Sequence, residues 1–259
     1  MQVSVIAKGL NVYTLQSLAV SGGNYIVPTL DGQLLTVTPA GTRTVLADLL
    51  KADLGVPFGM TEQGTDLIVT VSGYLPQHYL VRVKADGAVS TIADLSEMSG
   101  AYGAPFGVVV DRDVYWVTLS QDVVEDQSQL VRVDAQGKAS AIADLSRFGN
   151  PFGITMRDRS FVVAQSFGHL VQVTEQGEVS SIADLKSAGF GLPFDVAVWR
   201  DRLVATTNAG LVIQVMPDGK VSAIVNVQEQ KFGIPAGIAV DGEDLVVTTN
   251  GGFLLRVSG

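Results

Sequence analysis

A short phrase, proline-phenylalanine-glycine followed by an apolar residue, returns along the chain at an almost constant spacing. The prolines that open the phrase and its variants are Pro57, Pro105, Pro151, Pro193 and Pro235, so successive copies lie 48, 46, 42 and 42 residues apart. A fixed period near 40 residues is typical of repeat architectures, in which each repeat is one supersecondary unit stacked on its neighbours. The repeat predicts that the 259 residues form one domain.

A second phrase closes each unit, and its clearest copy is Val89-Ser90-Thr91-Ile92-Ala93-Asp94-Leu95. Close copies span 138–145 and 178–185, weaker copies span 42–49 and 220–225, and a further copy stands at 2–7. The last unit, which ends at Gly259, lacks the phrase. The N-terminal copy is therefore expected to supply the segment that the last unit is missing.

Each unit is expected to contain four short antiparallel strands. Val, Ile, Leu and Thr dominate the apolar segments, as strands require, and no segment carries a sustained helical period. Glycine-containing pairs such as Asp86-Gly87, Gln136-Gly137, Gln176-Gly177 and Asp218-Gly219 precede the closing phrase. Such pairs favour tight hairpins, because glycine adopts positive φ without steric cost.

Four-stranded units at this period predict an all-β, six-bladed β-propeller, closed by an N-terminal strand that completes the last blade. Closure of this kind removes an exposed sheet edge. A β-solenoid is the alternative, but its coils are usually shorter and it needs no N-terminal copy of a missing strand. The expected blades one to six span 15–49, 57–95, 105–145, 151–185, 193–226 and 235–258, with 2–8 as the outer strand of blade six.

The Pro-Phe-Gly-apolar opening, the apolar strand that ends in Ser or Asn, and the following Leu-Val-x-Val together resemble six-bladed propellers of the broad NHL and SMP-30-like group. The chain is most similar to ScyD/ScyE-type proteins, and the resemblance extends over essentially its whole length. It implies a propeller fold and a role in a biosynthetic pathway. It is weak for function, because propellers support many activities on one scaffold.

Composition narrows the classes of partner. The formal net charge of −9 disfavours nucleic acid and anionic membrane surfaces, which need a basic footprint. No apolar run approaches the length of a membrane span. The absence of cysteine excludes disulfides, thiolate catalysis and cysteine zinc sites. We expect a monomer. No signal peptide is visible, and the compartment stays open between the cytoplasm and a secreted or periplasmic location after removal of a leader.

Aromatic residues are expected to gather on the face where the inner strands begin, where they would line a partly apolar pocket for a small molecule. The alternative is that the repeated phenylalanines simply pack between blades. With the corner residue Ser166, the candidate ligand-binding residues are Tyr74, Tyr102, Phe106, Phe148, Phe152, Phe190, Phe194, Phe232 and Ser166.

Asp195 stands where the other opening phrases carry Gly59, Gly107, Gly153 and Gly237. A carboxylate beside a central channel needs solvent, a donor or a cation, and carboxylate and amide oxygens suit calcium or another divalent cation. The candidate metal ligands are Asp195, Asn150, Asn208 and Asn250. Alternatively, polar residues at these corners bond their own turns.

The SMP-30-like resemblance implies acidic and asparagine ligands around the channel opening and a metal-assisted lactonase activity. This chain departs from that pattern, because the early inner strand offers Gln16 and Ser17 in place of a glutamate. A hydrolase or lyase centred on Asp195 therefore stays an alternative to ligand binding. Asp195, His169 and His78 are the candidate catalytic residues, with both histidines expected in loops between second and third strands. Solvated histidines are the simpler interpretation, and no serine-hydrolase elbow is present.

Blades two and three carry extra residues at 73–78, 96–104 and 121–128. Long loops in a compact repeat fold are often functional. These segments are expected to form an adjustable rim on the same face as Asp195. The third function class is therefore a protein-interaction platform that uses this rim.

Overall fold

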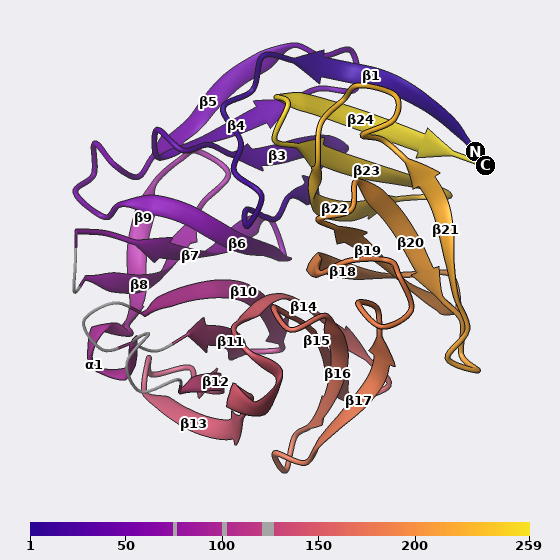
Figure 1. Ribbon diagram of the computed structural model, residues 1–259. Helices are drawn as coiled ribbons and strands as arrows, with labels where there is room; N and C mark the ends of the chain where they lie inside the picture. Colours follow the sequence, from indigo (N-terminus) through magenta and orange to yellow (C-terminus); the bar gives the residue numbers. More distant parts are fainter. Residues whose placement is uncertain (75–76, 100–102, 121–126) are drawn as a thin grey trace.

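The computed structural model describes residues 1–74, 77–99, 103–120 and 127–259, and within them it forms six four-stranded antiparallel sheets. Figure 1 shows the six sheets arranged around a central axis, with the two termini side by side. The fold class predicted from the repeat, a six-bladed β-propeller, is confirmed. Tyr102, one of the candidate ligand-binding residues, lies outside the described residues, as do parts of all three rim segments.

Each blade runs from an inner strand to an outer strand. The inner strands are β2 Ala19–Ser21, β6 Val56–Gln63, β10 Ala104–Asp111, β14 Pro151–Arg157, β18 Pro193–Trp199 and β22 Pro235–Asp241. The second strands are β3 Asn24–Pro28, β7 Asp66–Ser72, β11 Val114–Ser120, β15 Ser160–Gln165, β19 Arg202–Thr207 and β23 Asp244–Thr249. The third strands are β4 Gln33–Val37, β8 His78–Val83, β12 Ser128–Val133, β16 His169–Thr174, β20 Leu211–Val215 and β24 Phe253–Ser258. The outer strands are β5 Arg43–Asp48, β9 Val89–Asp94, β13 Ala139–Asp144, β17 Val179–Asp184, β21 Val221–Asn226 and β1 Gln2–Lys8.

The N-terminal strand closes the ring. β1 pairs antiparallel with β24, with Gln2 opposite Ser258 and Lys8 opposite Phe253. It thereby becomes the outer strand of blade six, in the order β1-β24-β23-β22. This confirms the interpretation of the closing phrase that the last unit lacks.

Some details differ from the expectation. The inner strand of blade one begins at Ala19 rather than near Gln16, because Gln16 and Ser17 bond neighbouring backbone instead of a strand of their own blade. The connectors after blades two and three contain a short helix α1 Ser96–Ser99 and a 3₁₀ turn η1 Ser146–Phe148. Among the described residues, no helix is long and apolar enough to cross a membrane.

The repeated phrases have local causes. Gly87 turns with φ +84°, and a Cβ added there would lie 2.2 Å from the carbonyl oxygen of Leu46 in the preceding blade. Glycine at this turn therefore provides both the left-handed conformation and the close packing of one blade on the next. The pairing register shifts between Pro57 and Met60 and at the same place in the other Pro-Phe-Gly blades, so the phrase is a β-bulge at the start of each of these inner strands.

The hydrophobic core lies between the blades. It divides into six clusters, each built from two neighbouring blades, such as Val163 and Trp116 between blades three and four. Side chains alternate along each strand toward the preceding and the following blade. Every blade is therefore held from both sides, and the inner strands come close together around the axis.

Candidate functional site

Four phenylalanines form an arc at the start of the inner strands. The ring centroids of Phe58 and Phe106 lie 5.4 Å apart, those of Phe106 and Phe152 5.5 Å apart, and those of Phe152 and Phe194 6.3 Å apart. The first two pairs meet edge to face, which is a favoured geometry of aromatic rings. We call this end of the channel the phenylalanine face. The rings are half-buried and contact one another, which agrees with packing between blades.

The arc is interrupted in blades six and one, where the positions are taken by Ala236 and Gln16. Gln16 is 1% exposed. Its Nε2 donates to the carbonyl oxygen of Pro57 at 2.8 Å, and its Oε1 accepts from the backbone N–H of Tyr13 at 2.8 Å. Because both ends of its buried amide are hydrogen-bonded, Gln16 links blade one to blade two.

One residue deeper, the inner strands approach each other so closely that side chains are almost excluded. A Cβ on Gly59 would lie 2.0 Å from the carbonyl oxygen of Phe106, and one on Gly107 would lie 2.7 Å from that of Phe152. A Cβ on Gly153 would lie 2.1 Å from the Oδ1 of Asp195. Glycine is therefore required by the neighbouring blade at these positions, and Asp195 fills space that Gly153 leaves free.

The carboxyl group of Asp195 is held between blades five and six. Its Oδ1 accepts from the backbone N–H of Val196 at 2.9 Å, and its Oδ2 accepts from the backbone N–H of Ile238 at 3.0 Å. Ser17 makes the matching contact between blades one and two, because its Oγ accepts from the backbone N–H of Met60 at 3.0 Å. Both residues thus use a side-chain oxygen to join adjacent inner strands.

Burial sets the acidity of Asp195, which is 7% exposed. Burial raises the pKa of its carboxyl from the ordinary 3.8 to about 7, and the N–H donors of Ile238 and Val196 oppose that shift only in part. Near neutral pH the group therefore exists in both protonation states. This is the range in which a carboxyl can exchange a proton with a bound molecule.

A cavity of about 270 Å³ occupies the channel on the far side of Asp195 from the phenylalanine arc. Its wall consists of the middle and end of the inner strands, and we call that end of the molecule the hairpin face because the turns between first and second strands lie there. Most of the lining residues are apolar, Met60, Val108 and Ile238 among them, while Thr61, Thr155, Ser17 and Asp195 bring polar groups to the wall.

Toward the phenylalanine face the channel narrows to about 10 Å³ of free space, lined by Gln16, Phe106, Phe194 and Asp195 among others. Asp195 lines both the narrow part and the cavity. Among the aromatic residues that the sequence predicted to bind a ligand, Phe106 and Phe194 therefore reach the channel. The space large enough for a ligand lies beyond them.

The polar corner residues bond the chain just before the inner strand of their own blade. The Oδ1 of Asn208 accepts from the backbone N–H of Leu192 at 2.8 Å, and the Oδ1 of Asn250 accepts from that of Ile234 at 2.7 Å. Ser166 Oγ accepts from the backbone N–H of Asn150 at 2.7 Å, and the Oδ1 of Asn150 accepts from Ser128 Oγ.

No contact within the described residues joins one of these asparagines to Asp195, and those residues contain no group of three or more His, Cys, Asp or Glu able to hold a metal. The amide oxygens of the three asparagines accept from Ser128, Leu192 and Ile234, and both Asp195 oxygens accept from backbone N–H groups. A divalent-cation site formed by these four residues stays a prediction from the sequence.

The remaining aromatic candidates lie outside the channel. Phe148, Phe190 and Phe232 are half-buried and pack on the inter-blade clusters, and Phe232 meets Phe253 edge to face at 5.2 Å. Tyr74 is 78% exposed. The channel and these connector residues thus form separate features of the surface.

The histidines are not in loops, as the sequence had suggested, because each begins a third strand: His78 in β8 and His169 in β16. His78 is fully buried, its Nδ1 lies 3.1 Å from Ser72 Oγ, and burial lowers its pKa. His169 packs on the ring of Phe148 at 5.1 Å, and its Nδ1 lies 3.0 Å from Ser181 Oγ. Neither histidine lines the cavity beside Asp195.

One buried polar residue had no sequence signal. Gln165, at the end of β15, is fully buried, and neither its amide oxygen nor its amide nitrogen has a hydrogen-bond partner. Leu119 and Val71 occupy the matching positions of blades three and two. Thr207 and Thr249 occupy this position in blades five and six, so alignment of the repeats would not have singled out Gln165 by its polarity.

The fold and the axial cavity define the class of the protein: it is a six-bladed β-propeller whose central channel has a mixed polar and apolar wall with the buried carboxyl group of Asp195 in it. No protein-family model and no curated protein sequence matches the chain.

Solved structures with the same fold are numerous. Virginiamycin B lyase from Staphylococcus aureus, solved as a catalytically inactive variant with quinupristin, aligns at 15% identity and TM-score 0.68 over 94% of this chain and 80% of that one. A streptogramin B lyase aligns at 13% identity and TM-score 0.67 over 99% and 97%. A protein of unknown function from Bacteroides thetaiotaomicron aligns at 14% identity and TM-score 0.73 over 99% and 75%.

At these identities the likeness establishes the fold alone. None of the three structures is described as an NHL, SMP-30-like or ScyD/ScyE-type protein, so that narrower resemblance stays a prediction from the sequence.

Proposed function

We propose that this propeller binds a small, partly apolar molecule in its central channel, with Asp195 as the polar anchor. The observation that carries the proposal is a single carboxyl group, with a pKa of about 7, in the wall of a cavity of about 270 Å³ whose lining residues are mostly apolar. A concave, mostly apolar space with a few polar groups is the usual form of a small-molecule site. Its volume is close to the lower end of the usual range, so the ligand is small.

The chemistry of the wall selects the ligand. An amine or another hydrogen-bond donor near Asp195 gains a charge-assisted bond, because a nearby positive charge favours the ionised carboxyl. The apolar body of the ligand then covers side chains such as Met60, Val108 and Ile238. The hydroxyl groups of Thr61 and Thr155 offer the remaining hydrogen bonds. The resemblance to ScyD/ScyE-type proteins supports a place for such binding in a biosynthetic pathway.

A lyase is the second candidate, and the pKa of Asp195 favours it. A carboxyl that titrates near 7 is suited to take a proton from one atom of a substrate and to return it to another. Two of the fold neighbours are named as lyases, which supports this reaction class by analogy only. A metal-assisted hydrolase is less favoured, since the amide oxygens of Asn150, Asn208 and Asn250 already accept hydrogen bonds from other parts of the chain. The interaction platform at the rim has no support in the described part of the rim.

The test replaces Asp195 by serine, because Ser17 makes the same inter-blade contact with a hydroxyl group. Asp195→Ser therefore keeps a side-chain oxygen that can accept from a backbone N–H, and it removes the carboxyl group. The probes are small aromatic amines and their neutral methyl analogues, with binding measured by saturation-transfer NMR and calorimetry near pH 7. We expect the parent to prefer the amine, and Asp195→Ser to weaken amine binding about tenfold, which corresponds to the loss of one charge-assisted hydrogen bond.

Glu175→Ser is the matched control, because it removes an exposed carboxylate far from the channel wall. It should bind the amines as the parent does. Equal binding by the parent and Asp195→Ser would remove Asp195 from the site.

A further inference from the structure

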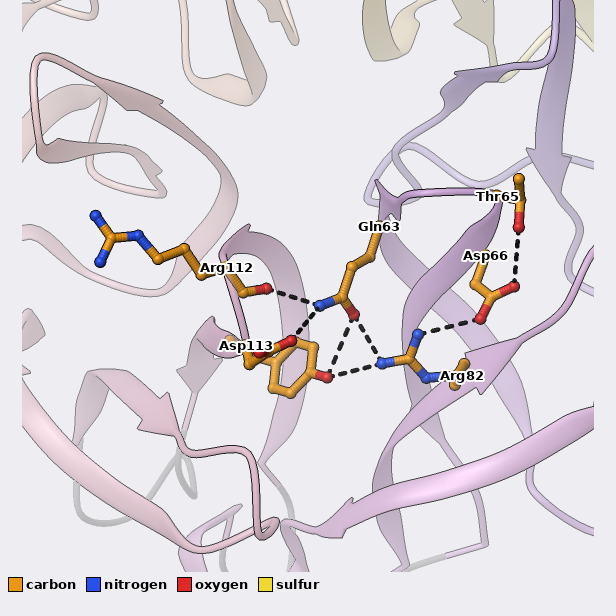
Figure 2. Close-up of polar contacts among 7 residues, drawn as sticks. Gln63, Thr65, Asp66, Arg82, Arg112 and Asp113 are labelled. Atoms are coloured by element: carbon orange, nitrogen blue, oxygen red, sulfur yellow. Dashed lines mark hydrogen bonds and ion pairs between the residues drawn. The ribbon is translucent and has the colours of Figure 1, made fainter.

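On the hairpin face, the junction between blades two and three is filled by a half-buried arginine network. Arg82 Nη1 donates to Asp66 Oδ2 at 3.1 Å, while its Nη2 donates to Gln63 Oε1 at 2.7 Å and to the hydroxyl of Tyr115 at 2.9 Å. Figure 2 shows Gln63 between Arg82 and the turn of the next blade, where its amide nitrogen also donates to the carbonyl oxygen of Arg112. The guanidinium group is thus surrounded by oxygen atoms from two blades.

The same device recurs between blades six and one. Arg256 donates to Asp244 Oδ2 at 2.9 Å and to Asp241 Oδ2 at 3.2 Å, and it also donates to the hydroxyl of Tyr25. Strand register gives these residues the positions of Arg82, Asp66, Gln63 and Tyr115. Two junctions between blades are therefore filled in the same way, each by a guanidinium group and a tyrosine.

The junction between blades one and two lacks both groups. Register puts residues without charge or aromatic ring at the four matching positions, namely Ser21, Asn24, Thr36 and Leu67. Each of the other three junctions has an arginine among its matching residues: Arg132, Arg157 or Arg202. Within the described strands, only the junction of blades one and two has none.

The consequence is a cavity of about 370 Å³ between these two blades, lined by all four of these residues. Ile26, Leu46 and Val83 give it an apolar floor. Glu62 and Lys84 stand in its wall, and neither side chain makes an ion pair or hydrogen bond within the described residues. Glu62 and Lys84 are exposed to solvent at the rim, and the polar groups of Ser21, Asn24 and Thr36 distinguish this hollow from a wholly apolar packing gap.

We propose that this cavity binds a small molecule that carries a guanidinium group on an apolar chain. The ligand takes the place that Arg82 and Arg256 hold in the sister junctions, with its planar cation facing Ser21, Asn24 and Thr36. The carboxylate of Glu62 supplies the countercharge, and the apolar chain covers Ile26, Leu46 and Val83. A guanidinium group presents several N–H donors in one plane, whereas an ammonium group is a compact point charge. A set of neighbouring oxygen acceptors therefore suits the guanidinium group better. The site is separate from the central channel.

The test grafts the missing side chain. Thr36→Arg places a guanidinium group from the protein itself in the cavity. Thr44→Arg is the matched control, because Thr44 lies opposite Thr36 on the exposed outer strand and does not line the cavity. The probe is butylguanidinium, compared with butylammonium, and calorimetry measures both affinities. Thermal unfolding of each variant verifies that it folds.

We expect the parent to bind butylguanidinium at least tenfold more tightly than butylammonium. Thr36→Arg should weaken butylguanidinium binding at least tenfold, whereas Thr44→Arg should leave it within twofold of the parent. Glu62→Gln should also weaken it, which ties the site to its countercharge. No binding to the parent, equal binding of the two probes, or equal binding in the two arginine variants would each overturn the proposal. Thr36→Arg should leave the binding of aromatic amines in the channel unchanged, because Thr36 does not line the channel, so failure here is distinguishable from failure in the channel.

Discussion

At the scale of single residues, the molecule departs from its own repeat at Asp195 and Ser17. Both carry an oxygen where four other blades carry glycine, and both bond the backbone of the following blade. Ser17 does this with a neutral hydroxyl, whereas Asp195 brings a titratable group into the axis. The stability of the fold should therefore depend on the protonation of Asp195.

The pKa of Asp195 is raised from 3.8 to about 7, so the folded protein holds this proton more tightly than the unfolded chain does. Its contribution to the free energy of unfolding is complete below about pH 4 and is lost as the pH rises through 7. The upper limit of that loss is about 4 kcal/mol, from a shift of roughly three pKa units at 1.36 kcal/mol each. We expect urea unfolding at pH 4.5, 6 and 7.5 to show a falling stability that Asp195→Ser lacks.

Comparison of the parent with Asp195→Ser isolates the contribution of Asp195 to the pH dependence of stability. Burial lowers the pKa of His78, which gives a slope of the opposite sign below pH 6.5 in both parent and variant. The lowered pKa values of Asp144 and Asp184 act below pH 4, outside this window. Parallel curves for parent and Asp195→Ser would mean that Asp195 is ionised without cost in the folded protein.

At the scale of elements, closure depends on β1. The strand buries Ala7 and packs Ile6 and Val3 on the clusters beside blade six, and it covers the edge of β24. Deleting residues 2–7 should lower the free energy of unfolding by roughly 3–5 kcal/mol, the equivalent of about two buried aliphatic side chains, and should expose an edge that promotes association. Calorimetry and size-exclusion chromatography measure the two effects.

Val5→Ser is the control for this deletion, because Val5 is 46% exposed and the pairing of β1 is retained. It should change stability by less than about 0.5 kcal/mol. An unchanged melting temperature after the deletion would show that β1 is dispensable for closure.

At the scale of the whole molecule, the diameter of the ring is limited by the glycines of the inner strands. A Cβ on Gly59 would lie 2.0 Å from a backbone oxygen and 2.7 Å from a backbone Cα of the next blade, and backbone cannot rotate away. Gly59→Ala should therefore cost about 3 kcal/mol or more, because it pushes two blades apart. Chemical denaturation measures this loss.

Gly64→Ala is the comparison, since its Cβ would meet nothing within 4 Å and only the positive φ of +66° opposes it. It should cost about 1 kcal/mol. If the two alanine variants are equally stable, the inner strands tolerate wider spacing than these contacts imply.

The sequence by itself determined the blade count, the order of strands and the closing role of residues 2–7, because each depends on periodic phrases and on turns a few residues long. The glycine turns at Gly87 and Gly137 follow from the same local rule, since positive φ is a property of the residue itself. Local sequence patterns were thus sufficient to predict the architecture of the propeller.

Only the tertiary structure decided where the chemistry lies. It bonded Asn208 and Asn250 to the segments that enter their inner strands, put His78 and His169 at the start of strands, and set the open cavity beyond the phenylalanine arc. It also revealed the hollow that Thr36 leaves where Arg82 fills the sister junction. Each of these features depends on which side chains meet across neighbouring strands and blades. That meeting is set by register and by the distance between blades, which a one-dimensional pattern does not contain.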